Sequence, residues 1–394
     1  IPMAGPRRIA VQMELHWPLK RHTAIYAGLQ QYAEEQGWET ILDDFVSDHL
    51  ARGGQKTFPY DGVIGRIDRD LAARAALMRL PVVNVWYSSP ARELLPGAFT
   101  DQVATGRLVA EHLLDRGLRR FAVTHRTDRS EQLAAQAFRD AIRGAGCECT
   151  TVELPLEFTH SATHYRPAMQ MIQEAIVSWH APLGVFVAND ALARIIAQTC
   201  RRLGLRTPHD AAIVCGENEE VFCLHTKPAL TSVEWAYLQI GRAAAALLDD
   251  MMQNGTAATT PPPQVFVPPA GLVVRESTDF VAVNDPLVND ALAFISANMQ
   301  RDIGQGDVAR AVHCEVRTLQ LRFRKVLGKP IVATIRHLRL ERAQRELAHS
   351  DRTLEAIARD TGFGSSPRLA AVFRRELGTT PSSYRRRWSN REHA

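Results

Sequence analysis

The stretch Phe323-Arg324-Lys325-Val326-Leu327-Gly328 occurs a second time, as Phe373-Arg374-Arg375-Glu376-Leu377-Gly378, at an offset of 50 residues (373 − 323). A short, alanine-rich amphipathic segment precedes each copy, at residues 307–312 and 355–360. Self-similarity at a fixed spacing indicates two copies of one structural unit. Within each copy an amphipathic segment is followed by a break and a second amphipathic segment, which predicts two helix-turn-helix units.

The second copy shows how each unit is expected to fold. Gly362 stands where the first helix must end, because glycine accepts a positive φ without a Cβ clash. In the next helix, the apolar side chains of Leu369, Val372 and Phe373 fall on one face and the arginines fall outside it. Residues 331–349 predict one long helix between the copies, which would hold the two units about 34 Å apart, as successive turns of DNA require.

Basic charge is concentrated in the same part of the chain. Residues 286–394 contain 20 Lys and Arg against 11 Asp and Glu, whereas the rest of the chain contains 27 against 32. Most of the excess is arginine, which forms bidentate contacts with phosphate groups and guanine edges. On a repeated helix-turn-helix this charge predicts double-stranded DNA as the partner. A helical bundle with a solvated basic face is the alternative.

The residues Gly362-Phe363, then Phe373-Arg374-Arg375, Leu377-Gly378 and Pro381-Ser382-Ser383-Tyr384-Arg385, resemble the DNA-binding domain of the AraC family of transcription regulators. The resemblance implies an all-α domain with two helix-turn-helix units over residues 286–388. An arginine that faces DNA can also contact phosphate alone, which positions the protein without reading bases. The candidate DNA-binding residues are Arg317, Gln320, Leu321 and Arg324 in the first copy, and Ser365, Ser366, Arg368 and Arg374 in the second.

Residues 7–280 follow a different pattern. Short apolar runs such as Arg8-Ile9-Ala10-Val11-Gln12 predict buried strands, and they alternate with helical segments of about 10–15 residues. This alternation predicts parallel, doubly wound sheets. A second, similar run begins near Arg120, so we expect two α/β lobes with a ligand site between them. The chain of 394 residues is long enough for both lobes and a C-terminal domain.

Ligands of open parallel sheets bind beyond the carboxyl ends of the strands. The residues that follow the predicted strands are rich in carboxylates, amides, arginines and tryptophans, a mixture that suits polyhydroxyl ligands. The candidate ligand-binding residues are Glu14, Trp17, Arg66, Trp86, Asp101, Arg126, Asn189, Asp190, Glu217 and Asn218. Asp101 and Asp190 also stand where helices begin, so an N-cap is the alternative role for each.

Residues 7–280 also resemble the type I periplasmic-binding-protein-like sensors of the LacI family, through Phe99-Thr100-Asp101-Gln102, Val187-Ala188-Asn189-Asp190 and residues 213–219. A sensor of this kind before an AraC-like domain is similar to the xylose operon regulator group. The resemblance implies a homodimeric, D-xylose-dependent activator that binds operator DNA, with RNA polymerase as a further candidate partner. Glu217 stands where the sugar-sensor pattern usually has Asp, and Arg66 stands where some relatives carry an acid. A different pentose or a small polyol is therefore the alternative effector.

Other classes of protein find less support in the sequence. Paired carboxylates could serve a sugar-processing enzyme. No nucleophile elbow, Walker loop or metal-ligand spacing accompanies them, so we expect no enzyme activity, metal or cofactor. The six cysteines lack CxxC spacing and are expected to be reduced thiols. No run of about 18 apolar residues occurs, so we expect no membrane span and a cytoplasmic location.

Overall fold

The computed structural model describes residues 6–15, 19–51, 59–159, 161–255, 261–280, 283, 285–350 and 352–389. The chain divides into two compact units. Residues 1–207 and 211–278 form the first unit, and residues 208–210 and 279–394 form the second. No helix in the described ranges is both long enough and apolar enough to cross a lipid bilayer.

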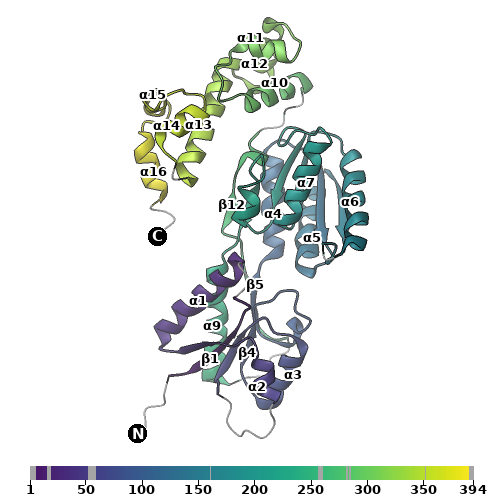
Figure 1. The fold of residues 1–394 in the computed structure, drawn as a ribbon, viewed down its shortest axis with the longest axis vertical. Coiled ribbons are helices and arrows are strands. Elements are labelled where there is room, and N and C mark those ends of the chain that lie inside the picture. Colours follow the sequence, from purple (N-terminus) through teal and green to yellow (C-terminus); the bar gives the residue numbers. More distant parts are fainter. Residues whose placement is uncertain are drawn as a thin grey trace. The chain divides into compact units, whose positions relative to one another are not determined.

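The first unit has two lobes, each built on a six-stranded sheet (Figure 1). The first sheet has the order β11-β5-β4-β3-β1-β2, and all of its paired strands are parallel. Its strands are β1 (Arg8–Gln12), β2 (Glu39–Leu42), β3 (Gly62–Gly65), β4 (Val82–Asn84), β5 (Gly97–Thr100) and β11 (Gln264–Val267).

The second sheet has the order β12-β10-β9-β8-β6-β7, and only β12 runs antiparallel to its neighbour. Its strands are β6 (Arg120–Arg126), β7 (Glu148–Leu154), β8 (Leu183–Val187), β9 (Ala211–Cys215), β10 (Thr231–Glu234) and β12 (Gly271–Val273). The two sheets have the parallel, doubly wound plan that the alternating pattern predicts.

Helices cover both faces of the first sheet. Successive strand residues point to opposite faces. Ile9 and Val11 of β1 therefore pack with α1 (Lys20–Gln36) and α9 (Tyr237–Asn254), while Ala10 between them packs with α3 (Arg69–Met78). The short helix α2 (Val46–Ala51) lies beside α3 (Figure 1).

The second lobe repeats this arrangement. Val185 and Val187 of β8 belong to a core with α6 (Ala162–Val177) and α7 (Asp190–Arg202), whereas Phe186 contacts Phe138 of α5 (Arg129–Gly144) on the opposite face. The helix α4 (Gln102–Asp115) packs closely on α5, and α8 (Glu220–Cys223) follows β9. The chain passes between the lobes at residue 101, at residues 235–236 and at residues 268–270. Asp101, a candidate ligand-binding residue, lies at the first of these crossings.

The second unit is all α-helical, and a long helix joins its two halves. Its helices are α10 (Pro286–Ala297), α11 (Gln305–Ala311), α12 (Val316–Leu327), α13 (Ile331–His349), α14 (Leu354–Asp360), α15 (Ser366–Leu377) and α16 (Pro381–Ser389). The N-terminal part of α13 contributes Ile331 and Ile335 to a core with α10, α11 and α12. Its C-terminal part contributes Leu340 and Leu347 to a second core with α14 and α15.

The two halves of this unit touch at a close backbone approach. Arg339, between the two cores, donates from Nε to the carbonyl oxygen of Met299 at 3.1 Å. Gly362 has φ of +78°, and a Cβ there would lie 1.9 Å from the same oxygen. Glycine is therefore required at residue 362 both for its positive φ and for space. The equivalent turn of the first half has His313 with φ of 52°, a less favourable residue for this conformation.

Candidate functional site

A cation–π pair lies at the carboxyl ends of β3 and β4 in the first lobe. The Arg66 guanidinium lies over the Trp86 ring, with its carbon 4.7 Å from the ring centre, and donates from Nη1 to Glu14 Oε2 at 3.1 Å. Burial lowers the pKa of Arg66. Arg66 Nε is buried and has no hydrogen-bond partner within the described residues. The pair therefore offers a polar ligand an unused donor beside an aromatic face. Trp17 lies outside the described residues.

Charged side chains join the two lobes at the N-terminus of α1. Arg21 Nη1 lies 3.5 Å from Glu217 Oε1, and Lys20 Nζ lies 2.7 Å from Glu234 Oε1. The Lys20 amide also donates to Glu219 Oε1 at 3.2 Å. The acids belong to the second lobe, so the ends of the two sheets meet here. We refer to Glu14, Arg21, Arg66, Trp86, Arg126 and Glu217 as the interlobe cluster.

Glu217 has the most perturbed acidity in the interlobe cluster. Burial raises the pKa of its carboxyl to about 7, and the charges of Asp190 and Glu131 act in the same direction. The arginines Arg21 and Arg126 oppose this shift. A quarter of the Glu217 side chain is exposed, so its carboxylate remains accessible to a ligand. Arg126 is itself held by Glu131, which accepts from Arg126 Nε at 2.9 Å.

Asp190 is the centre of a buried hydrogen-bond network in the second lobe. Its carboxylate accepts from the amides of Gly216, Glu217 and Glu219, at 2.9, 3.0 and 2.6 Å. It also accepts from Ser232 Oγ at 3.2 Å. Because these donors surround the carboxylate, Asp190 fixes the loop that carries Glu217.

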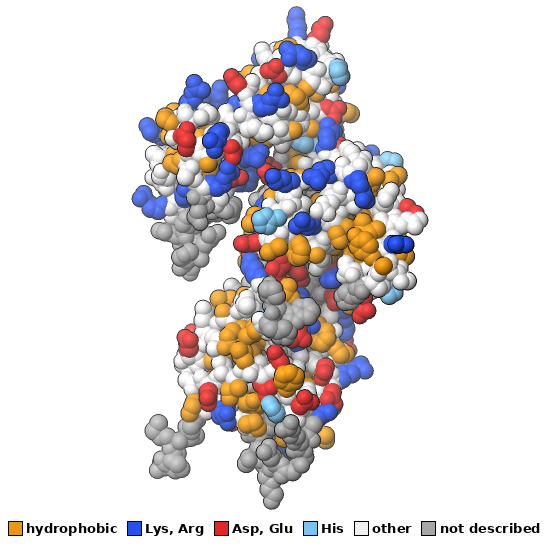
Figure 2. Space-filling model, viewed as in Figure 1, with side chains coloured by type: hydrophobic (Ala, Val, Ile, Leu, Met, Phe, Trp, Pro, Cys, Tyr) orange, Lys and Arg blue, Asp and Glu red, His pale blue; other side chains and the backbone are white. Residues whose placement is uncertain are grey.

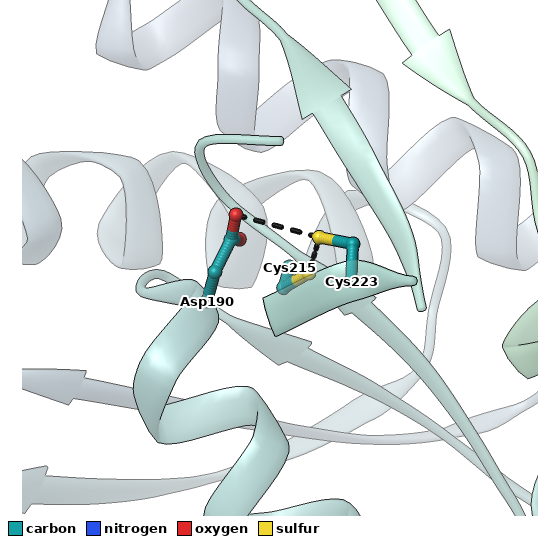
Figure 3. Close-up of side chains that lie close together, drawn as sticks. All are labelled: Asp190, Cys215 and Cys223. Carbon is teal, nitrogen blue, oxygen red and sulfur yellow. Dashed lines mark hydrogen bonds between the residues drawn. The ribbon is translucent and has the colours of Figure 1, made fainter. Parts of the chain in front are cut away.

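Two thiols complete the surroundings of this carboxylate (Figure 3). Cys223 Sγ donates to Asp190 Oδ2 at 3.5 Å and lies 3.8 Å from Cys215 Sγ. Thiolates and a carboxylate can together bind zinc. Here the carboxylate already accepts several hydrogen bonds, and burial raises the pKa of Cys215 well above its usual value. We therefore interpret the three side chains as a hydrogen-bonded cluster that supports the 216–219 loop.

Three more candidate side chains have structural partners. Asn189 caps α7 by accepting from the Leu192 amide at 3.1 Å, and Asp101 caps α4 by accepting from the Ala104 amide at 2.9 Å. Asn218 is buried with φ of 51°. Its amide nitrogen donates to Glu234, and its amide oxygen accepts from Arg275 Nη2 at 2.6 Å. The structure thus brings Glu14, Arg66, Trp86, Arg126 and Glu217 together and gives Asp101, Asn189, Asp190 and Asn218 internal bonds.

Sequence reasoning missed Arg21 and the aromatic pair Trp235 and Tyr237. Those two rings stack at the second crossing, with centres 6.0 Å apart and planes at 11°, and Trp235 Nε1 donates to the Gly216 carbonyl. A signal for Arg21 was present in the sequence, because Lys20 and Arg21 occupy the first turn of a helix with no acid there. Cations at a helix N-terminus oppose the helix dipole, so a basic pair in that place indicates partners from another segment.

The candidate DNA-binding residues lie on α12 and α15. Each helix buries an equivalent pair, Leu319 with Phe323 and Leu369 with Phe373, and presents its arginines outward. Arg317, Arg324, Arg368 and Arg374 are exposed, and no hydrogen bond or ion pair engages their guanidinium groups within residues 285–350 and 352–389. Figure 2 shows basic side chains spread over the visible face of this unit.

Among the other candidates on these helices, some make hydrogen bonds within the protein. Leu321 is exposed, but Gln320 donates to Gln305 Oε1 at 2.6 Å. The Ser366 amide donates to Glu355 Oε2 at 3.0 Å. Ser365 and Glu315 occupy the N-cap positions of α15 and α12, and neither side chain makes a capping hydrogen bond. The Ser365 hydroxyl makes no capping hydrogen bond to its own helix. It can therefore donate a hydrogen bond to a DNA phosphate.

Known protein families match both the α/β unit and the helical unit. Residues 110–278 match the periplasmic binding protein-like domain family, and residues 308–387 match a helix-turn-helix domain family. The xylose operon regulatory protein of Escherichia coli (strain K12) is 26% identical over 369 residues, which cover 92% of this chain and 93% of that protein. The protein of the same name from Haemophilus influenzae is 25% identical over 378 residues, covering 92% and 94%.

The fold has a solved counterpart over almost the whole chain. The structure of the xylose-binding transcription activator xylR matches with a TM-score of 0.76 and 23% identity, covering 97% of this chain and 98% of that one. The predicted fold class, an α/β sensor followed by an all-α double helix-turn-helix domain, is confirmed. The chain is therefore a transcription regulator, not an enzyme, with the domain plan of the xylose operon regulatory proteins: a periplasmic-binding-protein-like domain followed by an AraC-type helix-turn-helix domain.

Proposed function

We propose that this regulator binds a small sugar at the interlobe cluster, with D-xylose as the first candidate, and that sugar binding changes its action on operator DNA. The observation that carries the proposal is the Arg66 guanidinium, stacked on Trp86 with one buried nitrogen unpaired. A planar donor and an aromatic face suit the hydroxyls and the apolar face of a pyranose. The curated relatives that span the chain are xylose operon regulatory proteins, which supports D-xylose.

Sugar binding would act by selecting one arrangement of the lobes. Glu14, Arg66 and Trp86 belong to the first lobe, and Arg126 and Glu217 belong to the second. A ligand that contacts both groups prefers the lobe geometry in which both contacts form, and only such a preference shifts an equilibrium. Arg275, which holds Asn218 next to Glu217, lies just before residue 279, where the second unit begins. We propose this link as the route from the sugar to the DNA-binding unit.

We further propose that the protein acts in the cytoplasm as a homodimeric activator, with RNA polymerase as a partner at the promoter. The names of the relatives support a sugar-catabolic operon as the target. Symmetric operators suit a dimer, because oligomers of soluble proteins are mostly symmetric. Another pentose or a small polyol remains the second candidate effector, because Glu217 departs from the Asp expected in the sugar-sensor pattern and Arg66 stands where an acid is the alternative.

The test is isothermal titration of the full-length chain against D-xylose, L-arabinose, D-ribose, D-glucose and xylitol. Selective binding of D-xylose, together with a change in operator affinity at saturating sugar, is the expected result. Selective binding of another of these compounds would reassign the effector and keep the regulatory mechanism. Absence of heat with all five would contradict a sugar or polyol effector.

A further inference from the structure

A polar pocket beside β7, the edge strand of the second sheet, is lined by residues outside the interlobe cluster. It has a volume of about 530 Å³. The connection from β4 to β5, which contains the short 3-10 helix η1 (Arg92–Leu94), contributes Tyr87 and Arg92. The second lobe contributes His125, Arg129, Arg139 and Glu153 from β6, α5 and β7. We call it the edge pocket.

The edge pocket and the interlobe cluster use different residues. His125 and Arg126 are neighbours on β6, and consecutive strand residues point to opposite sides. Arg126 belongs to the interlobe cluster, whereas His125 lines the edge pocket. Tyr87, next to Trp86, packs edge-on against Phe99 with ring centres 5.7 Å apart. The two sites are therefore separate.

Three arginines make the edge pocket a place for an anion. Arg92 lies over the Tyr87 ring, with its guanidinium carbon 4.5 Å from the ring centre. Its side chain is only 11% exposed, and its Nε is buried without a hydrogen-bond partner within the described residues. Arg139 donates from Nη1 to Thr151 Oγ1 at 3.1 Å and from Nη2 to Gln136 Oε1, which leaves three of its five N–H groups for a ligand. Burial of an unpaired guanidinium nitrogen is costly, and a phosphate oxygen would remove that cost.

Two solvent-exposed carboxylates lie near these arginines, and their ion pairs are weak enough for an anion to replace them. Glu93 pairs with Arg129, and its carboxylate also lies 3.7 Å from Arg92 Nη2. Glu153 lies 3.8 Å from His125 Nε2. Both carboxylates are exposed to solvent, and exposed ion pairs contribute little. A phosphate dianion can therefore displace Glu93 from the arginines.

We propose that the edge pocket binds a small phosphorylated metabolite, with its phosphate on Arg92 and Arg129, which share Glu93, and its other polar groups toward Arg139. The lining comes from both lobes, so this ligand also favours one lobe geometry. By thermodynamic reciprocity, it then changes the affinity of the interlobe cluster for its own ligand, and the converse holds by the same factor. The proposal does not depend on which sugar the interlobe cluster binds.

The experiment is isothermal titration of the full-length chain with D-ribose 5-phosphate and, as the uncharged match, D-ribose. We expect binding of the phosphorylated compound that D-ribose does not reproduce. Arg129→Gln and Arg139→Gln should each weaken it about tenfold or more, the usual effect of losing a charge-assisted hydrogen bond. The control is Arg143→Gln, on the next turn of α5, whose side chain is 76% exposed and does not line the edge pocket. It should change nothing.

A second variant separates the two sites. Arg66→Ala removes a residue of the interlobe cluster, and D-ribose 5-phosphate should bind this variant as it binds the natural chain. Loss of binding in Arg66→Ala would place the phosphorylated compound at the interlobe cluster and overturn the proposal. Equal affinities for D-ribose and its phosphate, or equal weakening by Arg143→Gln and Arg139→Gln, would also overturn it.

Discussion

The two binding surfaces of this protein are prepared in opposite ways. At the interlobe cluster the charged side chains already have protein partners, as in the pair of Arg66 with Glu14 and that of Arg21 with Glu217. On α12 and α15 the exposed guanidinium groups of Arg317, Arg324, Arg368 and Arg374 have none within the described helices of the second unit. The first surface is preorganised by its own contacts, whereas the second presents exposed charges to its partner.

This difference follows from the two ligands. A small neutral sugar offers few contacts, so ordering the side chains in advance saves the entropy that binding would otherwise cost. DNA supplies a dense row of phosphates, and release of counterions drives binding without preorganisation. We therefore expect substitutions in the buried network that supports the first surface, such as those of Asp190, to affect folding and ligand binding together. Substitutions on the second surface should affect DNA binding alone.

The largest effect is expected from substitution of Asp190, which holds the loop that carries Glu217. Asp190→Ala removes the acceptor for the amides of Gly216, Glu217 and Glu219 and for the Ser232 hydroxyl. Buried donors left unpaired should lower the free energy of unfolding of the first unit by about 4 kcal/mol. Urea unfolding followed by tryptophan fluorescence measures this loss, and sugar affinity should fall with it.

The conservative variant Asp190→Asn separates a structural role of this side chain from direct contact with the sugar. Asp190→Asn keeps one acceptor oxygen and should lose less stability than Asp190→Ala. If instead both variants unfold like the natural chain but bind no sugar, Asp190 contacts the sugar directly, and the internal network is not its main role. Operator affinity without sugar should be unchanged in either variant.

The next effect concerns the sugar itself. Arg66→Ala removes the stacked donor beside Trp86 and should weaken sugar binding about 10- to 100-fold, with little change in stability, because Glu14 can be hydrated. Titration calorimetry measures the affinity. Arg242→Ala is the matched control, since Arg242 forms an exposed pair with Glu35 at 2.8 Å elsewhere in the same lobe. Similar losses in both variants would show that Arg66 has no special part in binding.

A smaller effect is expected on the DNA side. Arg368→Ala should weaken binding to an operator selected from random DNA about tenfold, without changing sugar affinity or stability. Weaker binding to all DNA sequences, with the slope of log K against log salt concentration reduced by about one, would indicate a phosphate contact. Weaker binding to the operator alone would indicate a base contact. The control is Arg375→Ala, because Arg375 pairs with Glu376 at 2.8 Å on the same helix. An unchanged operator affinity in Arg368→Ala would remove it from the DNA-facing surface.

The sequence was sufficient for the fold class, whereas the positions of the ligand and DNA sites stay predictions. The repeat around Phe323 and Phe373 predicts two helix-turn-helix cores, because the apolar residues of each core lie close together in the sequence. The partners of individual polar side chains could not be predicted in this way. Asn218 is bonded to Glu234 and to Arg275, and these contacts exist only after distant strands assemble into one sheet. For the same reason the sequence could not separate Asp190, which is fully bonded, from Glu217, which remains accessible.

The smallest effect is a pH dependence that arises from Glu217. Its carboxyl has a pKa of about 7 in the folded chain, whereas a glutamate in an unfolded chain has a pKa of about 4.3. Between these values the folded state binds more protons than the unfolded state, so the free energy of unfolding falls as the pH rises. Above the folded pKa both states are ionised, and the loss is complete.

Solvent screening of the partly exposed carboxyl limits this effect to about 1 kcal/mol. Many other groups titrate in the same range, so the natural chain must be compared with Glu217→Gln, which cannot ionise. The difference in free energy of unfolding between the two proteins should decline from about pH 4 to about pH 8, through the folded pKa, and then stay constant. A difference that does not change with pH would mean that Glu217 is solvated like a surface residue. In that case the interlobe cluster would resemble the recognition helices, with charges that are ordered only by the ligand.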